Sequence, residues 1–127
     1  MKKELRIKKS DEIELVMKSG VSKANRTFIV YKLKNTNNPK YRVAISASKK
    51  LGNAVARNKV KRQIRSLLHQ NDDLLQNGHD YFVISRPDLL LIDFETATKQ
   101  IRHILGLVNQ PSKGNNNKQT KIKNKNK

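Results

Sequence analysis

The side chains best suited to chemistry in this sequence are cations repeated at a helical spacing. Arg57, Lys61 and Arg65 stand four residues apart, so on a helix they form a single row. Such a row can follow a chain of phosphates, because each cation that neutralises a phosphate releases condensed counterions. The spacing therefore predicts a surface that binds a polyanion rather than a centre that makes or breaks bonds.

The distribution of charge supports the same prediction. The 127-residue chain has 28 Lys and Arg against 10 Asp and Glu, a net charge of +18. Residues 15–71 hold fourteen basic side chains and no acidic one, whereas residues 72–110 hold six acidic and three basic ones. Like charges four apart cost a helix about 0.2–0.5 kcal/mol per pair, so this window favours an anionic partner. We expect nucleic acid, with an anionic membrane surface or an acidic protein as the alternatives.

The remaining polar side chains do not form a recognisable catalytic set. Several acidic residues lie near expected helix or loop ends, where capping and solvation explain them: Asp11, Glu12, Asp72, Asp73, Asp88 and Asp93. The histidines lack the spacing of metal ligands: His69, His79 and His103. Without cysteine there is no disulfide, thiolate nucleophile or cysteine-bearing zinc site. We therefore expect the protein alone to catalyse nothing.

A short first helix is expected between Ser10 and Gly20. Ser10 is expected to cap the helix with its hydroxyl, and Gly20 is expected to end it. Ile13, Val16 and Met17 recur at the helical period and form one apolar stripe.

Two strands follow this helix. Residues 26–33 alternate, with Phe28 and Val30 on one face and Tyr31 on the other, so both faces should be covered. Turn-forming residues then lead into a second alternating run at 41–48, which predicts a hairpin.

The row of cations belongs to a longer helix that runs from Asn53, as a capping residue, to about Gln70. One arc of this helix is apolar: Ala56, Val60, Ile64, Leu67 and Leu68. The adjoining arc is basic and polar: Arg57, Asn58, Lys61, Arg62, Arg65 and His69. One helix should therefore have a buried side and a basic side.

The last elements are a buried strand at 81–85 and a helix capped by Asp93. The apolar stripe expected on that helix is Phe94, Ala97, Ile101, Ile104, Leu105 and Val108. The pattern predicts an α+β fold, a small α/β sandwich with one mixed sheet and three helices. The expected order is α-β-β-α-β-α, with room for an extra short strand.

The chain divides into a domain at 1–109 and a tail at 110–127. The tail is rich in asparagine and lysine and has Ile122 as its only apolar side chain, so we expect it to be disordered. The longest apolar runs fall far short of the roughly 20 residues that span a bilayer. We therefore expect a cytoplasmic protein.

The most specific segment enters and forms the basic helix. It reads Lys49-Lys50-Leu51-Gly52-Asn53-Ala54-Val55-Ala56-Arg57-Asn58-Lys59-Val60-Lys61-Arg62-Gln63-Ile64-Arg65. This segment resembles the signature of the bacterial ribonuclease P protein component, whose hallmark is an Arg-Asn-Arg run. Here the run is Arg57-Asn58-Lys59, which keeps the third charge but loses its guanidinium fork. The resemblance covers roughly residues 5–108.

The resemblance implies a fold with a left-handed crossover between two parallel strands and a role within a ribonucleoprotein. In that family the protein is the small subunit, and the RNA subunit hydrolyses precursor tRNA with bound Mg²⁺ to remove the 5′ leader. We expect the catalytic RNA and precursor tRNA as partners, no membrane and no nucleotide cofactor, and a protein that is monomeric without RNA. The residues that match the RNA-binding helix and its entry are Lys49, Lys50, Asn53, Arg57, Asn58, Lys59, Lys61, Arg62 and Arg65.

The resemblance also implies a cleft that holds the single-stranded leader, with Tyr31 as its stacking aromatic. The family usually places phenylalanines at the positions of Ile13 and Met17, so stacking from the first helix is lost here. Ordinary core packing explains these two residues equally well. Two other functions remain open: a structural RNA-binding protein such as a small ribosomal protein, and a protein-only nuclease.

Overall fold

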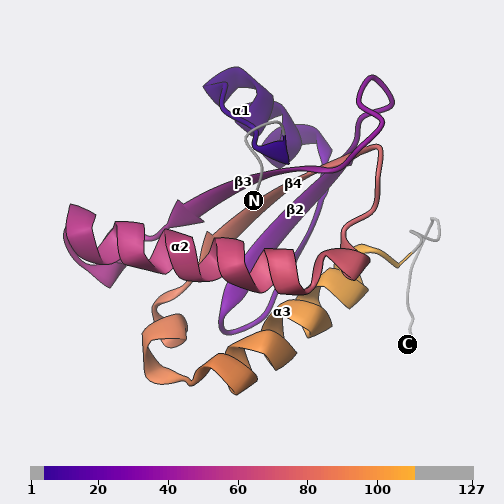
Figure 1. Ribbon diagram of the computed structural model, residues 1–127. Helices are drawn as coiled ribbons and strands as arrows, with labels where there is room; N and C mark the ends of the chain where they lie inside the picture. The colour runs from indigo at the N-terminus through magenta and orange to yellow at the C-terminus, as the bar shows by residue number, and fades with distance from the viewer. Residues whose placement is uncertain (1–4, 111–127) are drawn as a thin grey trace, which may run out of the picture.

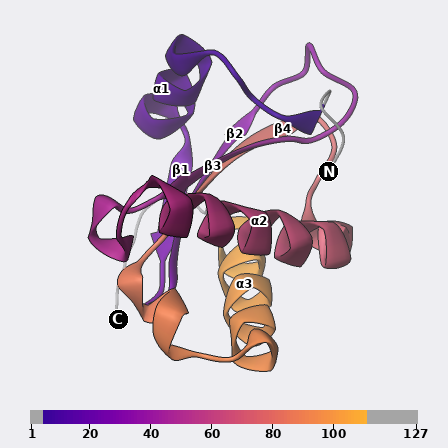
Figure 2. The same ribbon diagram turned by 60° about the vertical axis from the view of Figure 1, so that its left-hand side comes forward.

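The computed structural model describes residues 5–110 as a four-stranded sheet between helices (Figure 1). One helix covers one face of the sheet and two helices cover the other, as Figure 2 also shows. The elements are α1 (Ser10–Ser19), β1 (Val21–Ala24), β2 (Phe28–Lys34), β3 (Arg42–Ala47), α2 (Ala54–Gln70), β4 (His79–Ser85) and α3 (Phe94–Val108). The expected α+β fold is confirmed, and β1 is the additional short strand.

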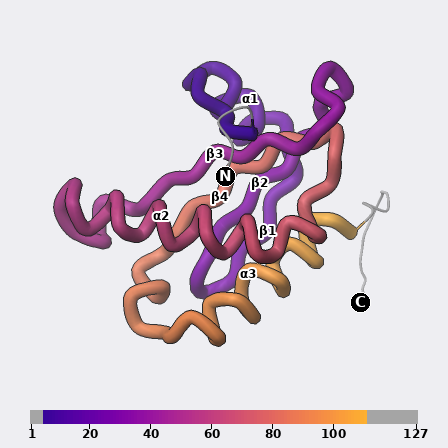
Figure 3. The backbone as a smooth tube through the Cα atoms, in the orientation of Figure 1, coloured from indigo at the N-terminus to yellow at the C-terminus, as the bar shows by residue number. Residues whose placement is uncertain are grey.

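The sheet has the order β1-β2-β4-β3. The predicted hairpin between residues 26–33 and 41–48 is therefore wrong, because β4 lies between β2 and β3 and pairs with both. Its β1–β2 and β2–β4 pairs are antiparallel, whereas β3 and β4 run parallel. Parallel neighbours need a long crossover, and α2 supplies it (Figure 3). The left-handed path implied by the family resemblance stays a prediction.

The core lies on both faces of the sheet, as the alternation in β2 predicts. Phe28 and Val30 are fully buried in the larger cluster, beneath α2 and α3. Tyr31 and Leu33 point the other way and pack in the smaller cluster beside Val16 of α1. Strand β2 therefore joins two layers of packing.

The start of α1 differs from the expectation. Ser10 is the first helical residue, and Lys9 holds the cap position in an extended conformation without a side-chain capping bond. The helix begins one residue early because the carbonyl of Lys9 already accepts a hydrogen bond from the N–H of Ile13, at 3.2 Å. The carboxylates of Asp11 and Glu12 in the first turn then stabilise α1 by interacting with the positive end of the helix dipole.

The two other predicted caps are confirmed. Asn53 accepts a hydrogen bond from the N–H of Ala56 at 3.0 Å, and Asp93 accepts one from Thr96 at 2.8 Å. The apolar stripe of α3 is wrong at Phe94, which is 53% exposed. Phe94 is the first residue of α3, and burial against the sheet begins one turn later, at Ala97.

Gly20 ends α1 as predicted, through a close approach rather than a left-handed backbone. Its φ is −82°, which any residue adopts. A Cβ placed there would lie 2.6 Å from the carbonyl oxygens of both Lys32 and Val16. The predicted tail lies, beyond Gln110, outside the described residues.

We expect Gly20→Ala to lower the free energy of unfolding by about 1–3 kcal/mol, because backbone must move to admit the methyl group. Gly106→Ala is the matched control, since a Cβ there meets nothing within 4 Å. Removing glycine from a helix interior should raise stability by up to about 1 kcal/mol. Urea unfolding of both variants measures the two effects, and equal stabilities would contradict the close approach at Gly20.

Candidate nucleic-acid interface

Helix α2 has the buried side and the basic side that the sequence predicts. Val60, Ile64, Leu67 and Leu68 are buried beneath it. The row of Arg57, Lys61 and Arg65 is half-buried along one flank, while Asn58 and Arg62 are exposed beside it. Lys59 is exposed but lies on another side of α2, because two residues turn a helix by about 200°. The structure thus groups five of the six predicted α2 residues.

The row runs beside β3, which is an edge strand of the sheet. At one end, Nε of Arg57 donates a hydrogen bond to the carbonyl of Ala47, at 3.3 Å. At the other end, burial lowers the pKa of Arg65 first, and the charges of Arg6 and Arg62 lower it further. Cations therefore gather at this end closely enough to repel one another, and an anionic partner would relieve that repulsion.

Arg6 is a member of this surface that the sequence reasoning missed. It forms a parallel bridge with Val43 of β3, and the N–H of Ile7 bonds to the carbonyl of Val43 at 2.9 Å. This pairing brings the N-terminal segment to Arg65. A local pattern could not have found it, because residues 1–14 are almost neutral overall and Arg6 joins the surface through a bridge to Val43, which is distant in sequence.

The entry to α2 is a short 3-10 turn at Lys49–Leu51. Lys49 and Lys50 are exposed, whereas Leu51 is buried and anchors the turn. Gly52 follows with φ of 126°, a conformation that favours glycine. Asn53 then caps α2 with its side-chain oxygen, so its amide group is what remains to meet a partner.

The predicted cleft residues lie on the α1 side of the sheet but in different environments. Tyr31 is half-buried and stacks against Phe82, with ring centroids 6.1 Å apart. Ile13 packs into the core cluster of that face, and Met17 is 43% exposed. Core contact is therefore greater at Ile13 than at Met17, and the cleft role of both residues stays a prediction. Phe82 is a second aromatic that the sequence reasoning did not single out.

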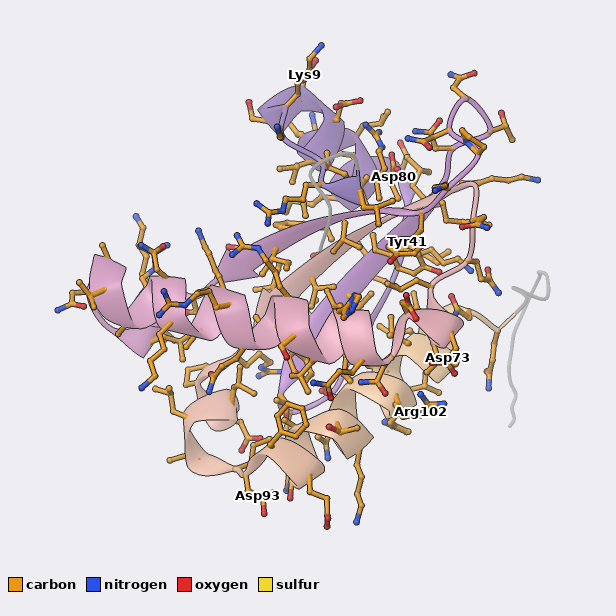
Figure 4. The ribbon with its side chains drawn as sticks, viewed as in Figure 1. Lys9, Tyr41, Asp73, Asp80, Asp93 and Arg102 are labelled. Carbon is orange, nitrogen blue, oxygen red and sulfur yellow. The ribbon has the colours of Figure 1, made fainter. Side chains whose placement is uncertain are left out.

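A buried ion network holds α1 against this face. Arg42 donates to both carboxylate oxygens of Asp80, at 3.0 and 2.8 Å, and to Glu12 of α1 at 3.2 Å. Asn35 adds a hydrogen bond to Asp80 at 3.0 Å. The bond to Asp80 is the main reason why the pKa of Arg42 is raised. Figure 4 shows Asp80 on the α1 side of the sheet, so the network fixes α1 beside the aromatic pair.

Other carboxylates are also engaged within the fold. Asp73 accepts two hydrogen bonds from Arg102, each at 3.2 Å, and the pair is visible in Figure 4. These bonds are the main reason why the pKa of Asp73 is lowered. Within residues 5–110, no three side chains of His, Cys, Asp or Glu come together as a metal cluster. The same part of the chain has no helix long and apolar enough to cross a membrane.

The fold and this surface together define a class: a small basic α+β protein with a cationic helix set beside an edge strand, as in proteins that bind nucleic acid. A comparison with known protein families identifies the family within this class. The model of the family described as Ribonuclease P matches residues 1–109. The chain belongs to the Ribonuclease P family.

Individual relatives agree with this assignment. The ribonuclease P protein component of Listeria welshimeri is 42% identical over 105 residues, which cover 83% of this chain and 88% of the relative. The solved RNase P protein of Staphylococcus aureus superposes with a TM-score of 0.74 at 36% identity, covering 83% of this chain and 95% of that one. The RNase P protein of Thermotoga maritima superposes with a TM-score of 0.73 at 28% identity, covering 83% of this chain and 98% of that one.

We expect Arg42→Met to lower the free energy of unfolding by about 3–5 kcal/mol, because it leaves the Asp80 carboxylate buried without its cation. The matched control is Glu14→Gln, which breaks the exposed pair between Glu14 and Lys18 at 3.6 Å. That pair should contribute less than about 1 kcal/mol. Urea unfolding compares the two variants, and a similar small loss in both would contradict the structural role of the network.

Proposed function

We propose that the basic face of α2, with the neighbouring β3 edge, binds the catalytic RNA, and that the Tyr31 face binds the leader of precursor tRNA. As a Ribonuclease P family member, the chain is the protein subunit of a ribonucleoprotein endoribonuclease that matures the 5′ ends of tRNA. The single observation that carries the proposal is the row of Arg57, Lys61 and Arg65 beside β3. A row with this spacing can meet successive phosphates of one RNA strand.

We further propose that the RNA subunit carries the hydrolysis, with Mg²⁺ bound mainly by that RNA. The engaged carboxylates support this division: Asp80 bonds to Arg42, Asp73 to Arg102, and Asp93 caps α3. The protein's own residues contribute binding and orientation of RNA, while the metal supplies the activation of water. We place the complex in the cytoplasm and expect the protein to be monomeric before it meets RNA.

Reconstitution tests the proposal. The protein, a ribonuclease P RNA and precursor tRNA are combined with Mg²⁺ at low concentration, and leader release is followed on a gel. Cleavage should be fastest with both subunits and absent with the protein alone. Cleavage by protein alone would indicate a protein-only nuclease. No effect of the protein on the RNA would favour the alternative of a structural RNA-binding protein such as a small ribosomal protein.

The basic row makes a quantitative prediction about salt. Arg57→Ala, Lys61→Ala and Arg65→Ala should each weaken binding of the catalytic RNA. Each lost phosphate contact should flatten the plot of log affinity against log salt by about 0.7–0.9. Lys99→Ala, an exposed lysine on α3, is the charge-matched control and should leave the slope unchanged. Unchanged slopes in all three row variants would remove α2 from the interface.

Tyr31 makes a separate prediction about the leader. A base stacked on its ring would contribute about 1–3 kcal/mol to binding. Tyr31→Ala should therefore weaken the binding of precursor tRNA by that amount and change the binding of mature tRNA very little. Tyr31→Phe keeps the ring and serves as the matched control. Both tRNA affinities are measured for the holoenzyme, together with the melting temperature of each variant. Equal losses for both tRNAs, or a large drop in melting temperature, would assign Tyr31 to the core instead.

A further inference from the structure

A cavity of about 780 Å³ lies at the sheet edge opposite the basic helix. Its walls are the end of α1 with β1, the end of β2 with the start of β4, and the last turn of α3. Four basic side chains are among its lining residues: Lys23, Lys32, Lys34 and His79. None of its lining residues in the described part of the chain is acidic. The cavity is therefore cationic, and none of the proposed RNA-interface residues belongs to it.

The strand register places these four side chains on one face of the sheet. Lys34 pairs with His79, and Lys32 stands two residues before Lys34 in β2. Lys23 pairs with Val30, two residues before Lys32. Paired residues and alternate residues of a strand project from the same face. All four therefore project from the face that α3 covers.

Lys32 is the buried member of this group, with only 9% of its surface exposed. Its Nζ donates to Oε1 of Gln76 and lies 6.0 Å from the centre of the Tyr81 ring. Both of these partners are neutral. Burial lowers the pKa of Lys32, because an ammonium group loses hydration there. An anion in the cavity would supply the missing opposite charge.

The other walls of the cavity suit an apolar or planar group. Val21 lines it from the sheet, and Leu107 and Val108 line it from α3. Cavities that hold small organic ligands have volumes of about 300–1,000 Å³, whereas a phosphate ion alone would fill only a small part of this one. The ligand that fits carries an anion at one end and a larger, partly apolar body at the other.

We propose that this cavity binds a nucleotide, with its phosphate between Lys23, Lys32 and Lys34 and its sugar and base against the apolar wall. His79 lines the same end of the cavity beside Lys34. The nucleotide is either a free mononucleotide or one residue of an RNA strand, since both present the same phosphate and base. This site goes beyond the proposed interface on α2 and does not depend on it.

An NMR titration of the full chain with adenosine monophosphate tests the proposal. Backbone amide shifts are expected at cavity residues, including Ser22, Leu33 and His79. Lys32→Met keeps the length of the side chain and removes its charge, so it should weaken the binding of adenosine monophosphate at least tenfold. Lys99→Met, at an exposed lysine of α3 outside both the cavity and the basic row, is the matched control and should leave these shifts unchanged. Inorganic phosphate alone should bind at least tenfold more weakly than the nucleotide.

Other variants and probes complete the test. If Lys32→Met does not fold, the double change Lys23→Ala and Lys34→Ala, at two exposed side chains, replaces it and should have the same effect. A single-stranded RNA tetranucleotide that binds the cavity more tightly than the mononucleotide assigns the site to RNA, and weaker binding assigns it to the free nucleotide. Shifts confined to α2, or unchanged affinity in the charge-removing variants, would overturn the proposal.

Discussion

The parallel pairing of β3 with β4 constrains the rest of the molecule. Two adjacent parallel strands cannot be joined by a tight turn, so the chain must travel the length of the sheet between them. Helix α2 forms most of this crossover and buries its apolar side on the sheet, which leaves its cations beside β3. The same register sets Arg42 directly opposite Asp80. One pairing thus positions both the cationic surface and the ion network that holds α1.

Charge is divided among the layers of the fold. The α1 side carries a compensated network, in which Arg42 meets two carboxylates. On the α2 side the cations of the row stand together, and burial with mutual repulsion disfavours the charge on Arg65. A folded protein that concentrates like charges lowers its own stability and gains it back when a polyanion binds. Stability and RNA binding are therefore coupled in this chain through the charges on α2.

Most local features were predictable from the sequence because neighbouring residues determine them, although Ser10 does not cap α1. The caps at Asn53 and Asp93 depend on a polar side chain and an amide three residues away, and both are confirmed. Long-range features were not predictable. Arg6 joins the surface only through the bridge to Val43, and Phe82 meets Tyr31 only through the antiparallel register. The resemblance identified the family and the basic helix, but a residue's neighbours across the sheet follow from register.

The position of β3 at the edge of the sheet has a consequence for the protein before it meets RNA. An edge strand presents unpaired N–H and C=O groups, and two copies of a chain can join through them into an aggregate. Here the N-terminal segment covers the edge at Val43, and the cations of α2 line its flank. A second copy would bring the same charges face to face, so strand-to-strand association is opposed at long range. The cations proposed to bind RNA thereby also oppose contact between two copies along this edge.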